Sequence, residues 1–373
     1  MGNEFGASRM EMMWGMTAGA LATVLISPMA GSLMDKRSAR ALFSVGALCL
    51  AGALALFSMS RNVWEFVLVF GSAMSVASTL LGPLGANTLV TRWFSRRRGR
   101  ALGITAVGTS LGGLVVPLLF QTLIDAHGWR QASLWLAGIV LVALLPPVLW
   151  IVRNRPEDLG LLPDGDAKAL QDRAPNAAAP SAELPNLFKD GSFWRISLAV
   201  GVLMAAFTAV LANLVPFAVG QGVAAKQAAF LLSAISLAGV SGKLLFSVFA
   251  DRINLKWALL AALVMAGLPM LLLVQFHGYW MMVAAAVSIG LASGAFLPAW
   301  GAILARIYGP LVFGRIMGRM QPVTIIMVMV TMPMTGYLFD LTGSYTTAFL
   351  VLAGAIALAI VGFLPLKVDG HGE

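Results

Sequence analysis

Charge is scarce in this sequence. Only 11% of its 373 residues are Asp, Glu, Lys or Arg, whereas a soluble domain carries about 25%. Hydrophobic residues make up 59% of the chain, and the mean hydropathy is +0.86. These values exclude an ordinary soluble protein and predict an all-α protein that crosses the lipid bilayer many times.

Other absences narrow the function. Cys49 is the only cysteine, which excludes an intrachain disulfide and a cysteine-based metal cluster. A phosphate-binding loop of the type Gly-x-x-x-x-Gly-Lys-Ser/Thr is missing, so we expect no ATP-driven activity from this chain. The three histidines lie outside the apolar runs, so we expect no metal site or histidine proton relay within the membrane. We therefore expect no enzyme activity, cofactor or metal.

Long apolar runs fill most of the chain. A membrane-spanning helix needs about 20 mostly apolar residues, and eleven segments meet this requirement. They are residues 12–34, 41–59, 64–90, 101–124, 131–152, 193–219, 227–250, 257–276, 280–304, 316–339 and 345–366.

Basic residues alternate between the loops. One set of loops holds Lys36, Arg37, Arg40, Arg92, Arg96, Arg97, Arg98, Arg100, Arg252, Lys256, Arg306, Arg315 and Arg319; the other set holds Arg9, Arg61, Arg130 and Lys226. The positive-inside rule places the richer set, and the C-terminus, in the cytoplasm. The net charge of +9 thus reflects membrane topology, and we expect no nucleic-acid partner. We predict a monomeric, multi-pass protein of the cell (inner) membrane.

Residues 153–192 interrupt the apolar pattern with five prolines and seven acidic against five basic residues. This composition indicates a hydrophilic cytoplasmic linker; a regulatory segment is the alternative. The predicted organisation is an N-terminal bundle of five helices (1–152), the linker, and a C-terminal bundle of six (193–373).

Three short segments recur at an offset of 215–216 residues. Gly31–Lys36 matches Ser247–Arg252, Arg98–Gly103 matches Phe313–Gly318, and Leu123–Gly128 matches Leu338–Gly343. Weak internal repeats of apolar helices are typical of secondary transporters. Shifted by the same offset, residues 193–216 fall at or before residue 1, so the second half has one helix that the first lacks.

Residues 31–40, Gly-Ser-Leu-Met-Asp-Lys-Arg-Ser-Ala-Arg, resemble the signature loop Gly-x-Leu-Ala-Asp-Arg-x-Gly-Arg-Arg of the major facilitator superfamily. Gly31, Asp35, Lys36 and Arg40 fit this pattern, whereas Ser38 stands at a glycine position. The second copy keeps Asp251 and Arg252. The resemblance covers essentially the whole chain and implies two pseudo-symmetric helix bundles.

Three stretches resemble the branch of monocarboxylate transporters and oxalate/formate antiporters. They are Arg92–Gly103, Gly128-Trp129-Arg130 and Asp340–Tyr345. Asn3–Arg9 is similar to the external loop after the first helix in that branch, so we expect the missing element to be helix one.

Lys243 is the one charged residue deep inside a predicted span. It precedes Asp251 by eight residues, or about 12 Å along a helix, near the middle of the membrane. Charge there is costly, and such residues are candidates for function. In the resembling branch a basic residue at this spacing binds the substrate carboxylate, which implies that role for Lys243. The alternative is a structural lysine satisfied by backbone carbonyls or by an acid on helix one.

The signature-loop residues Gly31, Asp35, Lys36, Arg40, Asp251 and Arg252 are predicted to act in conformational gating. Their acids can accept at a nearby helix N-terminus, where the dipole favours negative charge. Alternatively, the bases only fix topology. Four polar residues in or near spans are candidates for lining the substrate cavity, although hydrogen bonding between helices explains them equally well: Asn87, Gln121, Asn213 and Gln321.

Together these features predict a secondary active transporter of a small organic anion, a mono- or dicarboxylate, working by alternating access. Three alternatives stay open: a carrier of the same fold for a neutral or hydrophobic solute, a non-transporting membrane receptor, and an inactive truncated chain.

Overall fold

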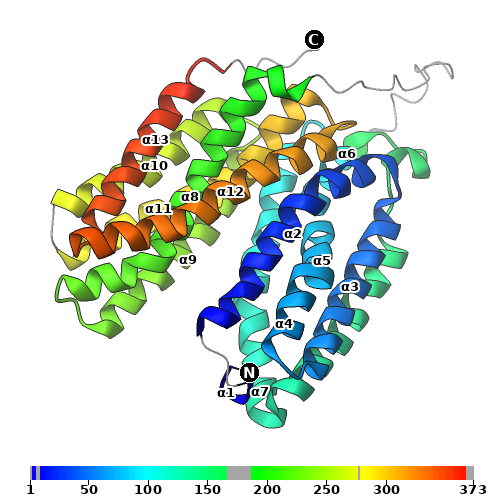
Figure 1. The fold of residues 1–373 in the computed structure, drawn as a ribbon. Coiled ribbons are helices and arrows are strands. Elements are labelled where there is room, and N and C mark those ends of the chain that lie inside the picture. The colour runs from blue at the N-terminus through cyan, green and yellow to red at the C-terminus, as the bar shows by residue number, and fades with distance from the viewer. Residues whose placement is uncertain (1, 6–8, 166–185, 276–277, 367–373) are drawn as a thin grey trace. The chain divides into compact units, whose positions relative to one another are not determined.

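The computed structural model describes residues 2–5, 9–165, 186–275 and 278–366. All regular secondary structure in these ranges is helical, which confirms the all-α prediction (Figure 1). The longer helices are α2 (Arg9–Lys36), α3 (Ala39–Met59), α6 (Pro83–Trp93), α7 (Arg98–Trp150), α8 (Gly191–Gly220), α9 (Ala225–Phe249), α10 (Leu255–Gln275), α11 (Tyr279–Tyr308), α12 (Phe313–Thr342) and α13 (Thr346–Phe363).

Shorter elements complete the described chain. Between α3 and α6 lie α4 (Val63–Val69), a π-helical turn η1 (Phe70–Met74) and α5 (Ser75–Leu81), which together with α6 form one candidate span. The N-terminal α1 covers Gly2–Phe5. Three 3-10 turns lie within the described parts of the predicted linker 153–192: η2 (Pro156–Leu159), η3 (Pro163–Gly165) and η5 (Leu187–Lys189).

In the described ranges, ten helices or helix runs are long and apolar enough to cross a membrane. One of them, α7, has 53 residues, or about 80 Å at 1.5 Å per residue, far more than a bilayer needs. Its helical geometry breaks at Gly128, where φ is 75°. It therefore contains the two separately predicted spans 101–124 and 131–152, and the protein is a multi-pass membrane protein.

The break at Gly128 has a counterpart in the repeat. Gly343, its match at offset 215, follows the end of α12 and has φ of 68°. Residues with a Cβ rarely adopt this left-handed region, so glycine suits both turns. The repeat thus marks corresponding helix ends.

The chain divides into two compact units, within each of which most residue contacts lie. Unit 1 contains residues 1–95, 111–182 and 310–322, and unit 2 contains residues 96–110, 183–309 and 323–373. The start of α7 therefore belongs to unit 2, and the start of α12 belongs to unit 1. The two units therefore differ from the predicted bundles 1–152 and 193–373 in these two segments: residues 96–110 group with the second unit and residues 310–322 with the first.

Each unit is held together by apolar packing. In unit 1, Phe57 packs against Phe66 and Phe70, with ring centroids 5.0 and 6.0 Å apart. In unit 2, α9 and α11 approach closely, and a Cβ built on Gly294 would lie only 2.7 Å from the backbone nitrogen of Lys243. Small residues allow such close contact between helices in a membrane, and here they hold the backbone that carries Lys243.

Candidate functional site

The repeated segments come together crosswise. In unit 1, Asp35 at the end of α2 accepts hydrogen bonds from the backbone N–H groups of Gly314 (2.9 Å) and Arg315 (2.8 Å) at the start of α12. The Arg315 Nε also donates to the same carboxylate at 3.3 Å. The first four N–H groups of a helix lack partners within it and attract negative charge. Asp35 therefore satisfies the N-terminus of a helix from the other half of the sequence; we call this contact the first crossing.

Unit 2 contains the corresponding contact, the second crossing. Asp251, which follows α9, accepts from the backbone N–H groups of Gly99 (2.8 Å) and Arg100 (3.3 Å) at the start of α7. These partners are the repeat matches of Gly314 and Arg315. The loop of each half thus binds the helix start of the other half.

Backbone contact is closest at the first crossing. A Cβ on Gly31 would lie 2.1 Å from the carbonyl oxygen of Gly314, and one on Gly318 would lie 2.4 Å from that of Ser27. No real Cβ tolerates such distances to backbone atoms. Gly31, predicted from the signature loop, is therefore required for helix packing.

The two crossings differ in strength. Asp35 is buried, with 8% exposure, and receives both backbone and guanidinium donors. Asp251 is exposed, and Ser247 stands in place of Gly31, donating its hydroxyl to the Arg100 carbonyl at 3.1 Å. Burial strengthens hydrogen bonds to a charged group, so we expect the first crossing to be the tighter one.

The basic residues of the signature loops lie in different settings. Lys36 and Arg252 are exposed beside the ends of α2 and α9. The Arg40 Nε donates to the Val152 carbonyl at 3.0 Å, and the backbone N–H of Arg40 donates to Asn154 at 3.3 Å. In this structure Arg40 therefore anchors the start of the predicted linker.

Ser38, which stands where the family has glycine, also contacts Asn154. Its hydroxyl donates to the Asn154 side chain at 2.9 Å and accepts from the Ala41 N–H, which caps α3. Farther along the linker, the Trp93 indole donates to the Arg153 carbonyl and the Ser95 N–H donates to Asp164. Within unit 1, residues 152–164 are thus bonded to the segment 38–95.

Lys243 lies on α9 in unit 2 and is buried, with 8% exposure. Its Nζ donates to the hydroxyls of Thr109 (2.9 Å) and Ser110 (2.6 Å) on α7. Neither hydroxyl was predicted as its partner. Among the residues that the structure describes, no carboxylate forms an ion pair with Lys243. The buried cation is held by neutral dipoles alone.

The predicted cavity-lining residues lie on four different helices, three of them in unit 1 and Asn213 in unit 2. Asn87 is buried on α6, and Gln121 is exposed on α7, where it donates to Asp125 at 2.7 Å. Asn213 on α8 donates to Ala209 within its helix and to Thr335 on α12 at 3.3 Å, and Gln321 is half-buried on α12. Asn213 thus forms a hydrogen bond between two helices, which was the alternative to a place in the cavity lining.

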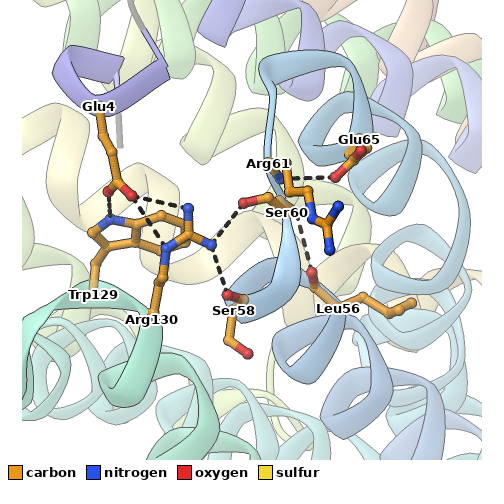
Figure 2. Close-up of polar contacts among 8 residues, drawn as sticks. All are labelled: Glu4, Leu56, Ser58, Ser60, Arg61, Glu65, Trp129 and Arg130. Atoms are coloured by element: carbon orange, nitrogen blue, oxygen red, sulfur yellow. Dashed lines mark hydrogen bonds and ion pairs between the residues drawn. The ribbon is translucent and has the colours of Figure 1, made fainter.

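A polar cluster joins α1, the α3–α4 loop and the Gly128 turn (Figure 2). Arg130 pairs with Glu4 at 2.9 Å and donates to the carbonyls of Ser58 (2.9 Å) and Ser60 (2.7 Å). Trp129 donates its indole N–H to Glu4, and the Arg130 guanidinium lies 4.4 Å from the Trp129 ring centroid. We call this the Glu4 cluster; it fastens the residues on which the branch resemblance partly rests.

The Glu4 cluster should respond to acid. Hydrogen bonds from Trp129 and Arg130 lower the pKa of Glu4 below its ordinary 4.5. A lowered pKa in the folded protein stabilises it above the unfolded pKa, and this contribution disappears as the pH falls through the folded pKa. Compared with Glu4→Gln, the wild type should therefore show a higher melting temperature in detergent at pH 7, and the difference should shrink as the pH falls below the ordinary glutamate value of 4.5.

Thermal melts between pH 3.5 and 8 measure this difference, which we expect to be small because the pair is partly exposed. Removing the partner supplies the control: with Arg130→Met in both proteins, the difference at pH 7 should be reduced. A pH-dependent difference that persists unchanged in that background would show that Arg130 is not the group stabilising the Glu4 carboxylate.

Several contacts carried no clear signal in the sequence. Thr109 and Ser110 are ordinary polar residues of an apolar helix, and Asn154 lies in a linker of low complexity. The Arg92 guanidinium donates to the Met34 carbonyl at the end of α2. In the described ranges, His, Cys, Asp and Glu do not gather in groups of three or more that could hold a metal.

Comparison with known proteins agrees with this architecture. Rat (Rattus norvegicus) monocarboxylate transporter 12 is 28% identical over 366 residues, covering 91% of this chain and 74% of the relative. Bovine (Bos taurus) monocarboxylate transporter 13 is 27% identical over 350 residues, covering 91% and 76%. These relatives span most of the described helices.

Solved structures share the fold at lower identity. The transporter FucP in its outward conformation matches with a TM-score of 0.75 and 19% identity, over 97% of this chain and 91% of FucP. The human organic anion transporter MFSD10 matches with a TM-score of 0.72 and 16% identity, over 95% and 83%. The sequence profile of the Major Facilitator Superfamily matches residues 1–244 and 218–373. With its crosswise signature loops and this full-length match, the chain belongs to the Major Facilitator Superfamily.

Proposed function

We propose that this transporter carries a small organic anion, a mono- or dicarboxylate, by alternating access. The observation that carries the proposal is Lys243, a buried ammonium group bonded to two neutral hydroxyls. A buried cation without a counter-charge is costly. An anion that binds beside it relieves this cost, whereas a cation adds to it.

The relatives support the same cargo. The curated relatives named above are monocarboxylate transporters, similar to this chain over more than nine-tenths of its length. Lys243 is a single charge, which matches a single carboxylate group. A dicarboxylate would need a second donor group for its other end.

The crossings provide the gating element of the proposal. Alternating access requires contacts that form in one state and break in the other. Asp35 and Asp251 hold backbone N–H groups of helix starts from the opposite half of the sequence. We assign the gate to these two acids with Gly31, while Lys36 and Arg252 are exposed beside them and Arg40 anchors the linker. We infer from the charge pattern of the loops that the crossings and the C-terminus lie on the cytoplasmic side.

A solute screen in proteoliposomes tests the function. Purified protein is reconstituted, and uptake of radiolabelled acetate, pyruvate, lactate, oxalate and succinate is measured with and without a pH gradient, beside glucose as a neutral solute. We expect saturable uptake of at least one carboxylate above that of empty liposomes. Uptake of glucose alone would favour a neutral cargo, and carboxylate binding without flux would indicate a receptor.

A further inference from the structure

We propose that Ser110 binds the substrate carboxylate together with Lys243, and that Thr109 is a positioning residue that holds the Lys243 ammonium in place. This inference rests on the proposed function, since it assigns two further residues to the same anion site. All three residues belong to unit 2.

Counting donors distinguishes the two hydroxyls. An ammonium group has three N–H donors, and Lys243 gives two of them, to Thr109 at 2.9 Å and to Ser110 at 2.6 Å. Thr109 gives its one proton to the Ala106 carbonyl of its own helix, at 2.7 Å. Thr109 can therefore only accept from Lys243, which fixes Nζ relative to α7.

Ser110 is placed differently. Its oxygen accepts from Lys243, but among the described residues its own O–H has no acceptor. One N–H of Lys243 and the O–H of Ser110 are thus both available on groups 2.6 Å apart. A carboxylate has two oxygens and accepts such a pair of donors bidentately.

The surface of α7 beside Ser110 is open among the described residues. Gly108 and Thr109 are exposed and Ser110 is half-buried. A Cβ built on Gly108 would meet no described heavy atom within 4 Å. The contact of Gly294 with α9 holds the backbone of Lys243, and its Nζ already lies 2.6 Å from the Ser110 hydroxyl. The cation therefore needs little movement to reach an anion at Ser110.

Kinetics of the five radiolabelled carboxylates in proteoliposomes test the assignment. We expect Ser110→Ala to raise KM about tenfold or more with a smaller change in turnover, because a hydrogen bond to a charged group is lost. Ser110→Thr, which keeps the hydroxyl, should restore most of the affinity. Thr109→Val should also raise KM. Thr105→Val is the matched control, since among the described residues the Thr105 hydroxyl bonds only to the Ala101 carbonyl of its own helix.

A double-mutant cycle separates a shared site from a structural role. In a Lys243→Gln background, Ser110→Ala and Thr109→Val should cause little further loss, because the groups act as a unit. If the wild type takes up none of the five carboxylates, both the proposed function and this inference are wrong. If uptake depends on Lys243 but Ser110→Ala leaves KM unchanged, only the inference is overturned.

Discussion

Replacing Lys243 by glutamine will reduce carboxylate uptake at subsaturating substrate by about 30-fold or more. Removing one partner of a buried, hydrogen-bonded charge pair costs roughly 2–5 kcal/mol, and 1.4 kcal/mol corresponds to a factor of ten. Glutamine keeps an unbranched, polar side chain, one bond shorter than that of lysine, but removes the charge. The initial rate of uptake of the preferred carboxylate, measured over a range of concentrations, gives the change in kcat/KM.

The matched control is Lys226→Gln, which removes an exposed lysine from the start of the same helix. This variant should transport like the wild type. Lys243→Arg keeps the charge but not the compact shape of the ammonium group, so we expect intermediate activity. Full uptake by Lys243→Gln would assign Lys243 a structural role and favour the carrier of neutral solutes.

The second large effect is expected at the first crossing, where Gly31→Ala should lower the melting temperature by roughly 5 °C or more. The new Cβ would lie 2.1 Å from the Gly314 oxygen, 2.8 Å from the Gly314 carbonyl carbon and 3.1 Å from the Gly318 Cα. All three atoms are backbone, so no side chain can turn aside, and α2 must move away from α12. Thermal unfolding of the purified protein in detergent measures the loss.

Gly52→Ala is the matched control, because it makes the same change in α3 of the same unit. A Cβ there would meet no described atom within 4 Å. In a helix, alanine is favoured over glycine by about 0.5–1 kcal/mol, so this variant should be neutral or slightly more stable. An equal loss in both variants would mean that the close approach at Gly31 does not determine stability. We also expect Gly31→Ala to slow transport, because the displaced Asp35 can no longer reach both N–H groups of α12.

Much of the architecture was predictable from the sequence because it depends on composition and local pattern. Apolar length determined the spans, and the repeat matched Asp35 with Asp251 and Gly128 with Gly343. Both matches reappear as equivalent structural features, two acids at helix starts and two glycines with positive φ. The predicted capping of a helix N-terminus by these acids is confirmed; their gating role stays a prediction.

What the sequence could not supply was the partner of each group. Lys243 was recognised by its depth, but its ligands Thr109 and Ser110 lie more than 130 residues away and carry no charge. The same holds for Arg40, whose bond to the Val152 carbonyl uses a backbone group that any residue possesses. Helix boundaries also differed from the prediction. Helical structure runs from Arg98 to Trp150, and only the non-helical backbone of Gly128 separates the two predicted spans.

The linker shows the same limit in another form. Its proline-rich composition indicated a tether, yet residues 152–164 are docked through Asn154 and Asp164. Residues 166–185 lie outside the described part of the chain. Composition predicts whether a segment can build a core, but not whether individual side chains bind a neighbouring surface.

The crosswise pairing of the repeats also constrains how the two halves of this sequence can diverge. If the halves arose by duplication, each copy would be free to accumulate changes wherever its residues contact only their own copy. Gly31, however, contacts Gly314 and Gly318, and Ser247 contacts Gly103, so each contact joins one copy to the other. A larger side chain in one copy requires a compensating substitution at the contacting position of the other copy. At these positions substitutions in the two copies are coupled. This coupling accounts for a repeat that is recognisable in these segments and weak in the rest of the sequence.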